Sequence, residues 1–77
     1  MKTIYSPASI ELCRWLRAQR LIQGLTMRQA GELLDKPHSF VAKTETGQRR
    51  LDVVEFVWYC RCLKFNPIDG LRLIIDK

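Results

Sequence analysis

The sequence predicts an all-α fold, a compact bundle of about five short helices, and three observations support this prediction. Apolar residues recur at spacings of three and four, which is the period of an amphipathic helix. Gly24, Pro37, Gly47 and Pro67 divide the chain into short segments, because glycine and proline end helices or begin new ones. The chain has 77 residues, 47% of them hydrophobic. This size predicts one domain over residues 1–77, without repeats or linkers.

The first helix is expected from about Ala8 to Gln23, after an N-terminal arm of residues 1–7 that ends in Ser6-Pro7. Proline can start a helix, and the glycine that follows Gln23 can end it. The expected apolar contacts come from Ile10, Leu12, Cys13, Leu16, Leu21 and Ile22. Arginines recur every three positions, which is typical of a solvated face. These are Arg14, Arg17 and Arg20.

Two short helices are expected next, within about residues 26–46. Thr26 is a good N-cap for the first of them, and Gln29 stands where a capping box has its second member, although no acid reinforces it. One stripe of this helix is apolar, and its small side lets another helix approach closely. The stripe consists of Met27, Ala30, Gly31 and Leu34.

The second helix of the pair is expected from about Pro37 to Thr46, with Gly47 as its stop. Only Val41 is clearly apolar and inward. The other faces carry His38, Ser39, Phe40 and Lys43. A helix this short and polar cannot be held by its own core burial, so we expect its outer face to have another purpose.

The last two helices are expected at about 52–63 and 68–75, separated by Asn66-Pro67. Asp52 and Glu55 form a capping box at the start of the first. That helix is apolar on too many sides for a surface helix. One stripe holds Val53, Phe56, Val57, Cys60 and Leu63, and another holds Val54, Trp58, Cys62 and Phe65. The last helix, with Ile68, Leu71, Ile74 and Ile75 on one side, is expected to cover part of the second stripe.

Two helices joined by a tight turn, the second polar outside and followed by the basic loop 48–50, form the arrangement with which a helix-turn-helix enters the major groove of DNA. The chain resembles the lambda-repressor-like, or XRE-type, helix-turn-helix family over about residues 14–70. The matching residues are Leu25, Thr26, Leu34, Ser39, Val41, Lys43, Glu45, Gly47 and Arg49, and the match continues from Arg50 to Phe56.

Four residues depart from the family pattern. Ala30 and Gly31 stand where the family usually has Leu-Ala, Asp35 replaces a common turn glycine, and Thr44 replaces an aliphatic residue. These departures predict a slightly underpacked or repacked core and a less relaxed turn. No position expected to face DNA is lost.

The resemblance implies a transcriptional regulator that reads double-stranded DNA. It implies base contacts from Ser39 and Lys43, since lysine can donate to guanine O6 and N7 and serine can bond to several bases. His38 could reach a base or a phosphate, and its alternative is an exposed histidine. Phe40 could touch a thymine methyl or a sugar, and its alternative is an inward packing role.

The resemblance also implies phosphate contacts from two segments. The first turn of the first paired helix offers N–H groups and a helix dipole, and the basic loop matches one that clasps the backbone. The residues are Thr26, Met27 and Arg28, and Gln48, Arg49 and Arg50. A plain cap at Thr26 and a merely solvated loop are the alternatives.

A structural ion pair is implied between Arg20 and Glu45. A bidentate pair would lock the first helix against the end of the recognition helix. Two independent surface charges are the alternative reading of the same residues.

A single domain of this size offers about one half-site, so a homodimer on an inverted repeat is expected, with recognition helices ~34 Å apart. The simplest mechanism is repression by occupancy of an operator. Residues 52–75 are the expected dimerisation region, with contacts from Trp58, Phe65, Leu71 and Ile74, and a completed core is the alternative. An antitoxin that holds a partner toxin through the last two helices is the alternative function.

Charge and composition limit the other function classes. The net charge of +5 favours a polyanionic partner, although RNA or an anionic membrane surface would suit it equally. No apolar run is long enough to span a membrane and the first residues lack a signal-peptide core, so a cytoplasmic protein is expected. Three cysteines are expected as structural thiols, and Cys60 and Cys62 point to opposite helix sides. No metal site, cofactor or enzyme activity is expected.

Overall fold

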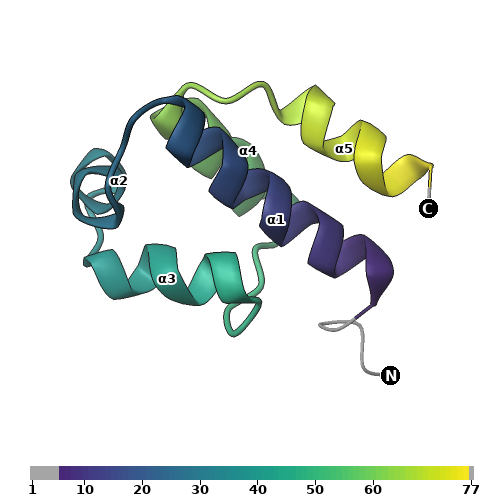
Figure 1. Cartoon of the computed structure of the whole chain (residues 1–77), viewed down its shortest axis with the longest axis horizontal. Helices are drawn as coiled ribbons and strands as arrows, with labels where there is room; N and C mark the ends of the chain where they lie inside the picture. The colour runs from purple at the N-terminus through teal and green to yellow at the C-terminus, as the bar shows by residue number, and fades with distance from the viewer. Residues whose placement is uncertain (1–5, 77) are drawn as a thin grey trace.

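Five helices make up residues 6–76, the part of the chain that the computed structural model describes (Figure 1). They are α1 (Pro7–Ile22), α2 (Met27–Leu34), α3 (His38–Thr46), α4 (Val53–Leu63) and α5 (Pro67–Ile75). The all-α prediction and the order of the helices are confirmed. The arm predicted for residues 1–7 lies outside the described residues, except for Ser6 and Pro7, which cap and start α1.

Side-chain caps start four of the helices, as the sequence predicts for α2 and α4. The Thr26 and Gln29 box is complete, with Gln29 N–H donating to Thr26 Oγ1 at 3.0 Å and Thr26 N–H donating to Gln29 Oε1 at 2.9 Å. The box of α4 has the same reciprocal bonds. Pro37, however, is the N-cap of α3 and does not belong to its first turn, so this helix begins one residue later than predicted.

The turn between α2 and α3 is strained in the expected way. Asp35 has a φ of 56° and a ψ of 43°, the left-handed region that glycine adopts more easily. The prediction of a less relaxed turn is therefore confirmed.

The core contains nine buried apolar residues. They are Leu16, Ala30, Leu34, Val41, Phe56, Tyr59, Cys60, Leu63 and Phe65. Tyr59 was not predicted, although it is among the largest fully buried side chains. Trp15 was also missed: its ring lies 6.3 Å from that of Phe56 and 5.9 Å from that of Phe65. Aromatic stacking therefore joins α1 to α4 and to the segment after it.

Several predicted apolar contacts are wrong because the residues lie at helix ends or at the edge of the buried face. Val53 is 77% exposed, since the buried face of α4 is centred on Phe56, Tyr59 and Cys60 and Val53 lies in the first turn at its margin. Other predicted contacts that are exposed are Ile10, Leu21, Ile22, Ile68 and Ile75.

The last helix packs mainly against α1, as Figure 1 shows, and a Cβ at Gly70 would lie only 2.8 Å from the Trp15 ring. The second stripe of α4 is covered only in part, since Phe65 is buried whereas Val54 is exposed. An open apolar groove of about 540 Å³ therefore remains on α4. Its lining consists of Val53, Val54, Val57, Trp58, Arg61 and Cys62, which we call the α4 groove.

The close approach of α2 to α3 depends on Gly31. A Cβ built there would lie 2.7 Å from the Lys36 carbonyl oxygen and 3.3 Å from His38 Cα. Of the two predicted outcomes, an underpacked or a repacked core, the structure at Gly31 agrees with the repacked one, because backbone fills the space.

We expect Gly31→Ala to lower the free energy of unfolding by about 1–3 kcal/mol, because the Lys36 carbonyl must move. In an open helix position the same substitution would instead raise the free energy of unfolding by up to about 1 kcal/mol. The sign of the change therefore shows whether the space at Gly31 is filled. Urea unfolding followed by circular dichroism measures it, with Glu32→Ala on the exposed face of the same helix as control. A more stable Gly31→Ala variant would contradict the close approach.

Burial changes the titration of two neighbouring core groups. It raises the pKa of the Cys60 thiol from 9.0 to about 12, and it also raises the pKa of the Tyr59 hydroxyl. The folded state therefore binds these protons more tightly than the unfolded state does. The stability that this difference provides is complete below pH 9 and is lost as the pH rises toward 12.

We expect the free energy of unfolding to fall by roughly 1.4 kcal/mol per pH unit for each such group once the pH exceeds its unfolded-state pKa, which is 9.0 for the Cys60 thiol and 10.0 for the Tyr59 hydroxyl. Urea unfolding at pH 7, 9 and 10.5 measures the slope, and Cys60→Ala should reduce it. A stability that stays constant over this range would contradict the burial of both groups.

Candidate nucleic-acid interface

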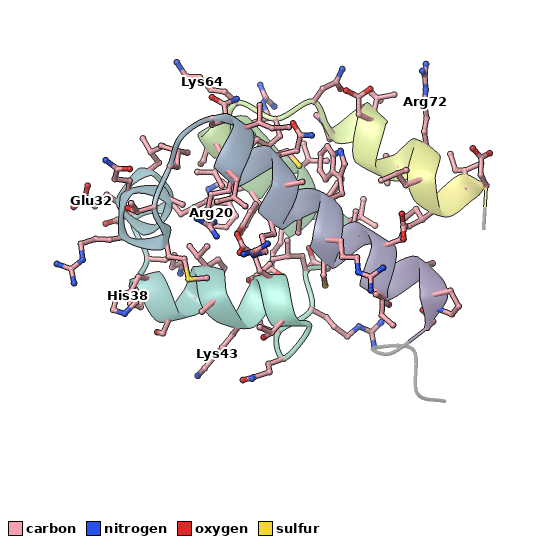
Figure 2. All side chains as sticks on the ribbon, viewed as in Figure 1. Arg20, Glu32, His38, Lys43, Lys64 and Arg72 are labelled. Atoms are coloured by element: carbon pink, nitrogen blue, oxygen red, sulfur yellow. The ribbon has the colours of Figure 1, made fainter. Side chains whose placement is uncertain are left out.

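The outer face of α3 is polar and points away from the bundle. Val41, Thr44 and Glu45 are buried on its inner side. Ser39 and Lys43, four residues apart and therefore on one face, are exposed. Figure 2 shows Lys43 pointing away from the other helices. The exposed His38 lies at the N-terminal end of the helix.

Hydrogen bonds hold the inner side of α3 in place. The Thr44 hydroxyl donates to the Phe40 carbonyl oxygen at 2.8 Å, and the Cys13 thiol on α1 donates to the Thr44 carbonyl oxygen at 3.4 Å. Burial raises the pKa of the Cys13 thiol, with a further contribution from the charge of Glu45. Cys13 thus remains a neutral donor, in agreement with the structural role predicted for it.

The predicted ion pair between Arg20 and Glu45 is present, and it is buried. Arg20 Nε lies 2.7 Å from Glu45 Oε2, and Nη2 donates to Oε1 at 3.1 Å. The third donor, Nη1, reaches the Leu25 carbonyl oxygen at 2.8 Å. The hydrogen bond to Glu45 raises the pKa of Arg20. The side chains are only 6% and 2% exposed, so the pair fixes the C-terminal end of α3 against α1 and the loop before α2.

The first turn of α2 offers limited room for a phosphate. The capping box already uses the N–H groups of Thr26 and Gln29, so a phosphate would meet the N–H groups of Met27 and Arg28. Arg28 is exposed, whereas the Met27 side chain packs against the core. Thr26 Oγ1 accepts the capping hydrogen bond, which is the plain cap role considered above.

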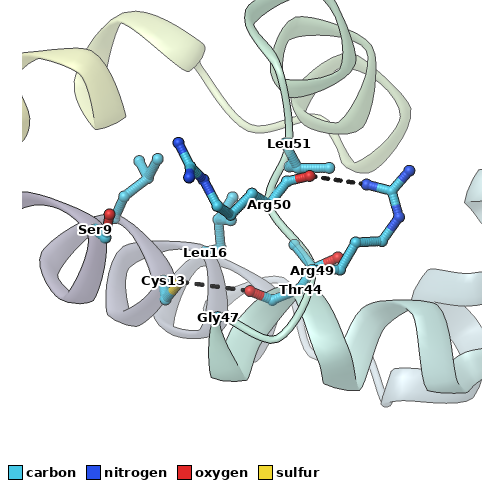
Figure 3. Close-up of a pocket in the computed structure, with 9 residues that line it drawn as sticks. Ser9, Cys13, Leu16, Thr44, Gly47, Arg49, Arg50 and Leu51 are labelled. Atoms are coloured by element: carbon cyan, nitrogen blue, oxygen red, sulfur yellow. Dashed lines mark hydrogen bonds between the residues drawn. The ribbon is translucent and has the colours of Figure 1, made fainter. Parts of the chain in front are cut away.

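The loop after α3 brings two arginines into different surroundings. Gly47 ends α3 with a φ of 83°, and the Arg49 N–H donates to the Lys43 carbonyl oxygen at 3.1 Å. Figure 3 shows the Arg49 and Arg50 side chains leaving the loop in opposite directions. Arg50 and Gln48 are exposed.

Arg50 borders a small pocket of about 160 Å³ between α1, the end of α3 and this loop (Figure 3). The other lining residues are Ser9, Leu12, Cys13, Leu16, Thr44, Gly47, Arg49 and Leu51.

Phe40 has the inward packing role that was its alternative. Its ring lies 6.1 Å from that of Trp58 and 6.2 Å from that of Tyr59. Arg49 covers the ring with its guanidinium carbon 4.8 Å from the centroid, and Lys36 Nζ lies 5.7 Å from it. The exposed Lys36 was not among the predicted site residues, because nothing in the sequence indicates that it reaches Phe40.

The residues predicted for a dimer contact divide into two groups. Phe65 is a core residue and Leu71 packs against the core, so both are engaged within the chain. Trp58 and Ile74 are partly exposed, and Trp58 lies at the edge of the α4 groove. The exposed apolar residues on α4 include Val54, which was not predicted as a contact.

Residues 6–76 contain neither a metal-binding cluster nor a membrane-spanning helix. No group of three or more histidine, cysteine, aspartate or glutamate side chains is placed to hold a metal ion. None of the described helices combines the length and the apolar character needed to cross a membrane.

Comparison with known proteins places this geometry in a family. No protein-family model matches the chain, and no curated protein matches it. The solved structure of an XRE-family like protein from Pseudomonas syringae pv. tomato str. DC3000 is 35% identical, with a TM-score of 0.83, over 96% of this chain and 90% of that chain. The clp gene regulator ClgR from C. glutamicum has the same fold, with a TM-score of 0.75 and 21% identity over 86% of each chain. The protein belongs to the XRE family of helix-turn-helix proteins.

Proposed function

We propose that the protein is a DNA-binding transcriptional regulator that recognises a specific sequence through α3. One observation carries the proposal: α3 presents Ser39 and Lys43 outward while the buried Arg20 and Glu45 pair holds its other side. A short helix fixed in this way can enter the major groove without losing its orientation. The membership of the protein in the XRE family supports the same function.

In this proposal α3 makes the base contacts, and the segments beside it make the phosphate contacts. Ser39 and Lys43 carry the donors and acceptors suited to base edges, and His38 stands at the end of the helix that enters the groove first. Arg28 and Arg50 are exposed cations suited to phosphates, which position the protein without reading sequence. Phe40 contributes by packing, since two cations and two aromatic rings surround it.

We expect Arg50→Ala to weaken binding to all duplexes and to flatten the dependence of log K on log salt by roughly one unit, as one phosphate contact is lost. Fluorescence anisotropy between 50 and 300 mM salt, about the range in which such slopes are resolved, measures the effect. A slope equal to that of the wild-type protein would mean that Arg50 is only solvated.

We further propose a homodimer that occupies an inverted-repeat operator in the cytoplasm and represses by blocking it. One domain presents one α3, and two half-sites about one helical turn apart need two copies. The α4 groove is the apolar surface suited to that contact, because Val53 and Val54 are more than three-quarters exposed there, at 77% and 78%.

The same groove supports a second candidate function. An antitoxin would use this apolar face to hold a protein toxin while its helix-turn-helix bound DNA. The two candidates differ in what the protein does alone, because only the regulator needs to dimerise without a partner.

Selection of duplexes from a random DNA pool at near-physiological salt, followed by sizing of the protein, tests both. Enrichment of an inverted repeat by a dimeric protein supports the regulator. A monomer that binds DNA without sequence preference contradicts it and directs attention to a partner for the α4 groove.

A further inference from the structure

Arg49 connects the loop to α3 and to α4, and it also forms a hydrogen bond within the loop. Its backbone N–H donates to the Lys43 carbonyl oxygen at 3.1 Å, near the end of α3. Its side chain donates from Nη1 to the Arg50 carbonyl oxygen at 3.0 Å, within the loop. Nη2 lies 2.8 Å from Glu55 Oε2, in the first turn of α4.

The guanidinium of Arg49 also lies over the Phe40 ring. Its central carbon is 4.8 Å from the centroid of the Phe40 ring, a distance typical of a cation on an aromatic face. Phe40 itself is held by Trp58 and Tyr59. The Arg49 side chain is thus placed by α3 and by the aromatic residues of α4 together.

Glu55 performs two tasks with one carboxylate. Oε1 accepts the Asp52 N–H at 3.2 Å and so closes the capping box of α4, while Oε2 binds Arg49. The positive charge of Arg49 is thus balanced by the negative charge of Glu55. Arg50, in contrast, forms no side-chain hydrogen bond or ion pair with any other residue of 6–76 in this structure.

We propose that Arg49 is a positioning residue for DNA binding, which fastens the loop to α3 and α4 so that Gln48 and Arg50 meet the phosphates in register with Lys43. The proposal rests on the function proposed above. It revises the phosphate contact that the family resemblance implies for Arg49, because Nη2 is bonded to Glu55, Nη1 is bonded to the Arg50 carbonyl oxygen, and the guanidinium lies over the Phe40 ring.

Glu55→Gln tests the proposal through the sign of its effect. Glutamine can still close the capping box, so α4 should keep its start. The substitution raises the net charge from +5 by one and removes a carboxylate beside the loop, which by electrostatics alone would tighten binding to DNA. Loss of the fastening predicts weaker binding instead, by roughly 3–10-fold.

Lysine substitutions at the two neighbouring arginines give a matched comparison. Lysine binds phosphate as a point charge but lacks the planar fork and the stacking face of arginine. Arg49→Lys should therefore lose several-fold in affinity, and it should lose more than Arg50→Lys, which keeps the positive charge that a phosphate contact requires. Glu32→Gln, on the exposed side of α2, controls for the charge change of Glu55→Gln.

The experiment measures anisotropy with a labelled duplex of the enriched sequence and with a mixed-sequence duplex, after melting curves have shown that each variant is folded. Weaker binding by Glu55→Gln and Arg49→Lys, with a larger loss for Arg49→Lys than for Arg50→Lys, supports the positioning role. Tighter binding by Glu55→Gln, or equal tolerance of lysine at both positions, overturns it. A wild-type protein that binds neither duplex overturns the proposed function itself, and the two failures are thus distinguished.

Discussion

Glu45→Ala is expected to lower the free energy of unfolding by about 3–5 kcal/mol, because it leaves the Arg20 guanidinium buried without its carboxylate. The lost bonds are those at 2.7 and 3.1 Å, in a pair whose side chains are 6% and 2% exposed. A domain of this size has only about 4–12 kcal/mol of stability in total. Urea unfolding at pH 7 should therefore show a large shift of the midpoint, and Arg20→Ala should behave similarly.

A double substitution distinguishes the cost of leaving one charge buried alone from the contribution of the ion pair itself. Arg20→Met combined with Glu45→Leu removes both charges at similar volume, and we expect it to cost much less than either single change. If Glu45→Ala cost under about 1 kcal/mol, as exposed pairs do, the locking of α3 by this pair would be refuted.

Alanine at both Ser39 and Lys43 is expected to remove most of the preference for the enriched sequence. Each base contact contributes roughly 1–3 kcal/mol of discrimination, so the loss of both should lower the ratio of specific to mixed-sequence affinity by about 30-fold or more. Stability should change by less than about 0.5 kcal/mol, since both side chains are exposed.

Competition binding with both duplexes measures this ratio. Arg72→Ala is the matched control, because it removes one positive charge from an exposed site on α5, far from Lys43 in Figure 2. An unchanged ratio in the Ser39 and Lys43 variant would show that other residues read the sequence.

The helices were predictable from the sequence because their caps and stops are local. Thr26, Asp52 and Gly47 act on residues within one turn, and the structure has each of them in the expected role. The buried faces of α3 and the pair between Arg20 and Glu45 were also found, the first from periodicity and the second from the family resemblance.

Errors arose where burial depends on which helices meet. The sequence shows that α4 is apolar on several sides, but not that α5 would pack on α1 and leave Val54 exposed. For the same reason Phe65 was expected at an interface and is in the core, while Trp15 and Tyr59 were missed. Amphipathic patterns rank faces of one helix, and they do not identify the partner of each face.

In the candidate site, too, local features were predictable from the sequence and contacts between distant segments were not. Ser39 and Lys43 are exposed because their spacing sets them on one face of a helix, which periodicity predicts. The engagement of Arg49 by Phe40 and Glu55 depends on the path of the loop through space. Adjacent arginines look equivalent in the sequence, although in the structure Glu55 and Phe40 engage the Arg49 side chain and Arg50 is exposed.

A DNA-binding surface made by α3 and the segments beside it is tested most directly by titrating ¹⁵N-labelled protein with the enriched duplex and following the amide chemical shifts. We expect the largest chemical-shift changes at 38–43, at 48–50 and at the first turn of α2. Changes confined to the α4 groove and α5, with the amides of Ser39 and Lys43 unmoved, would contradict it.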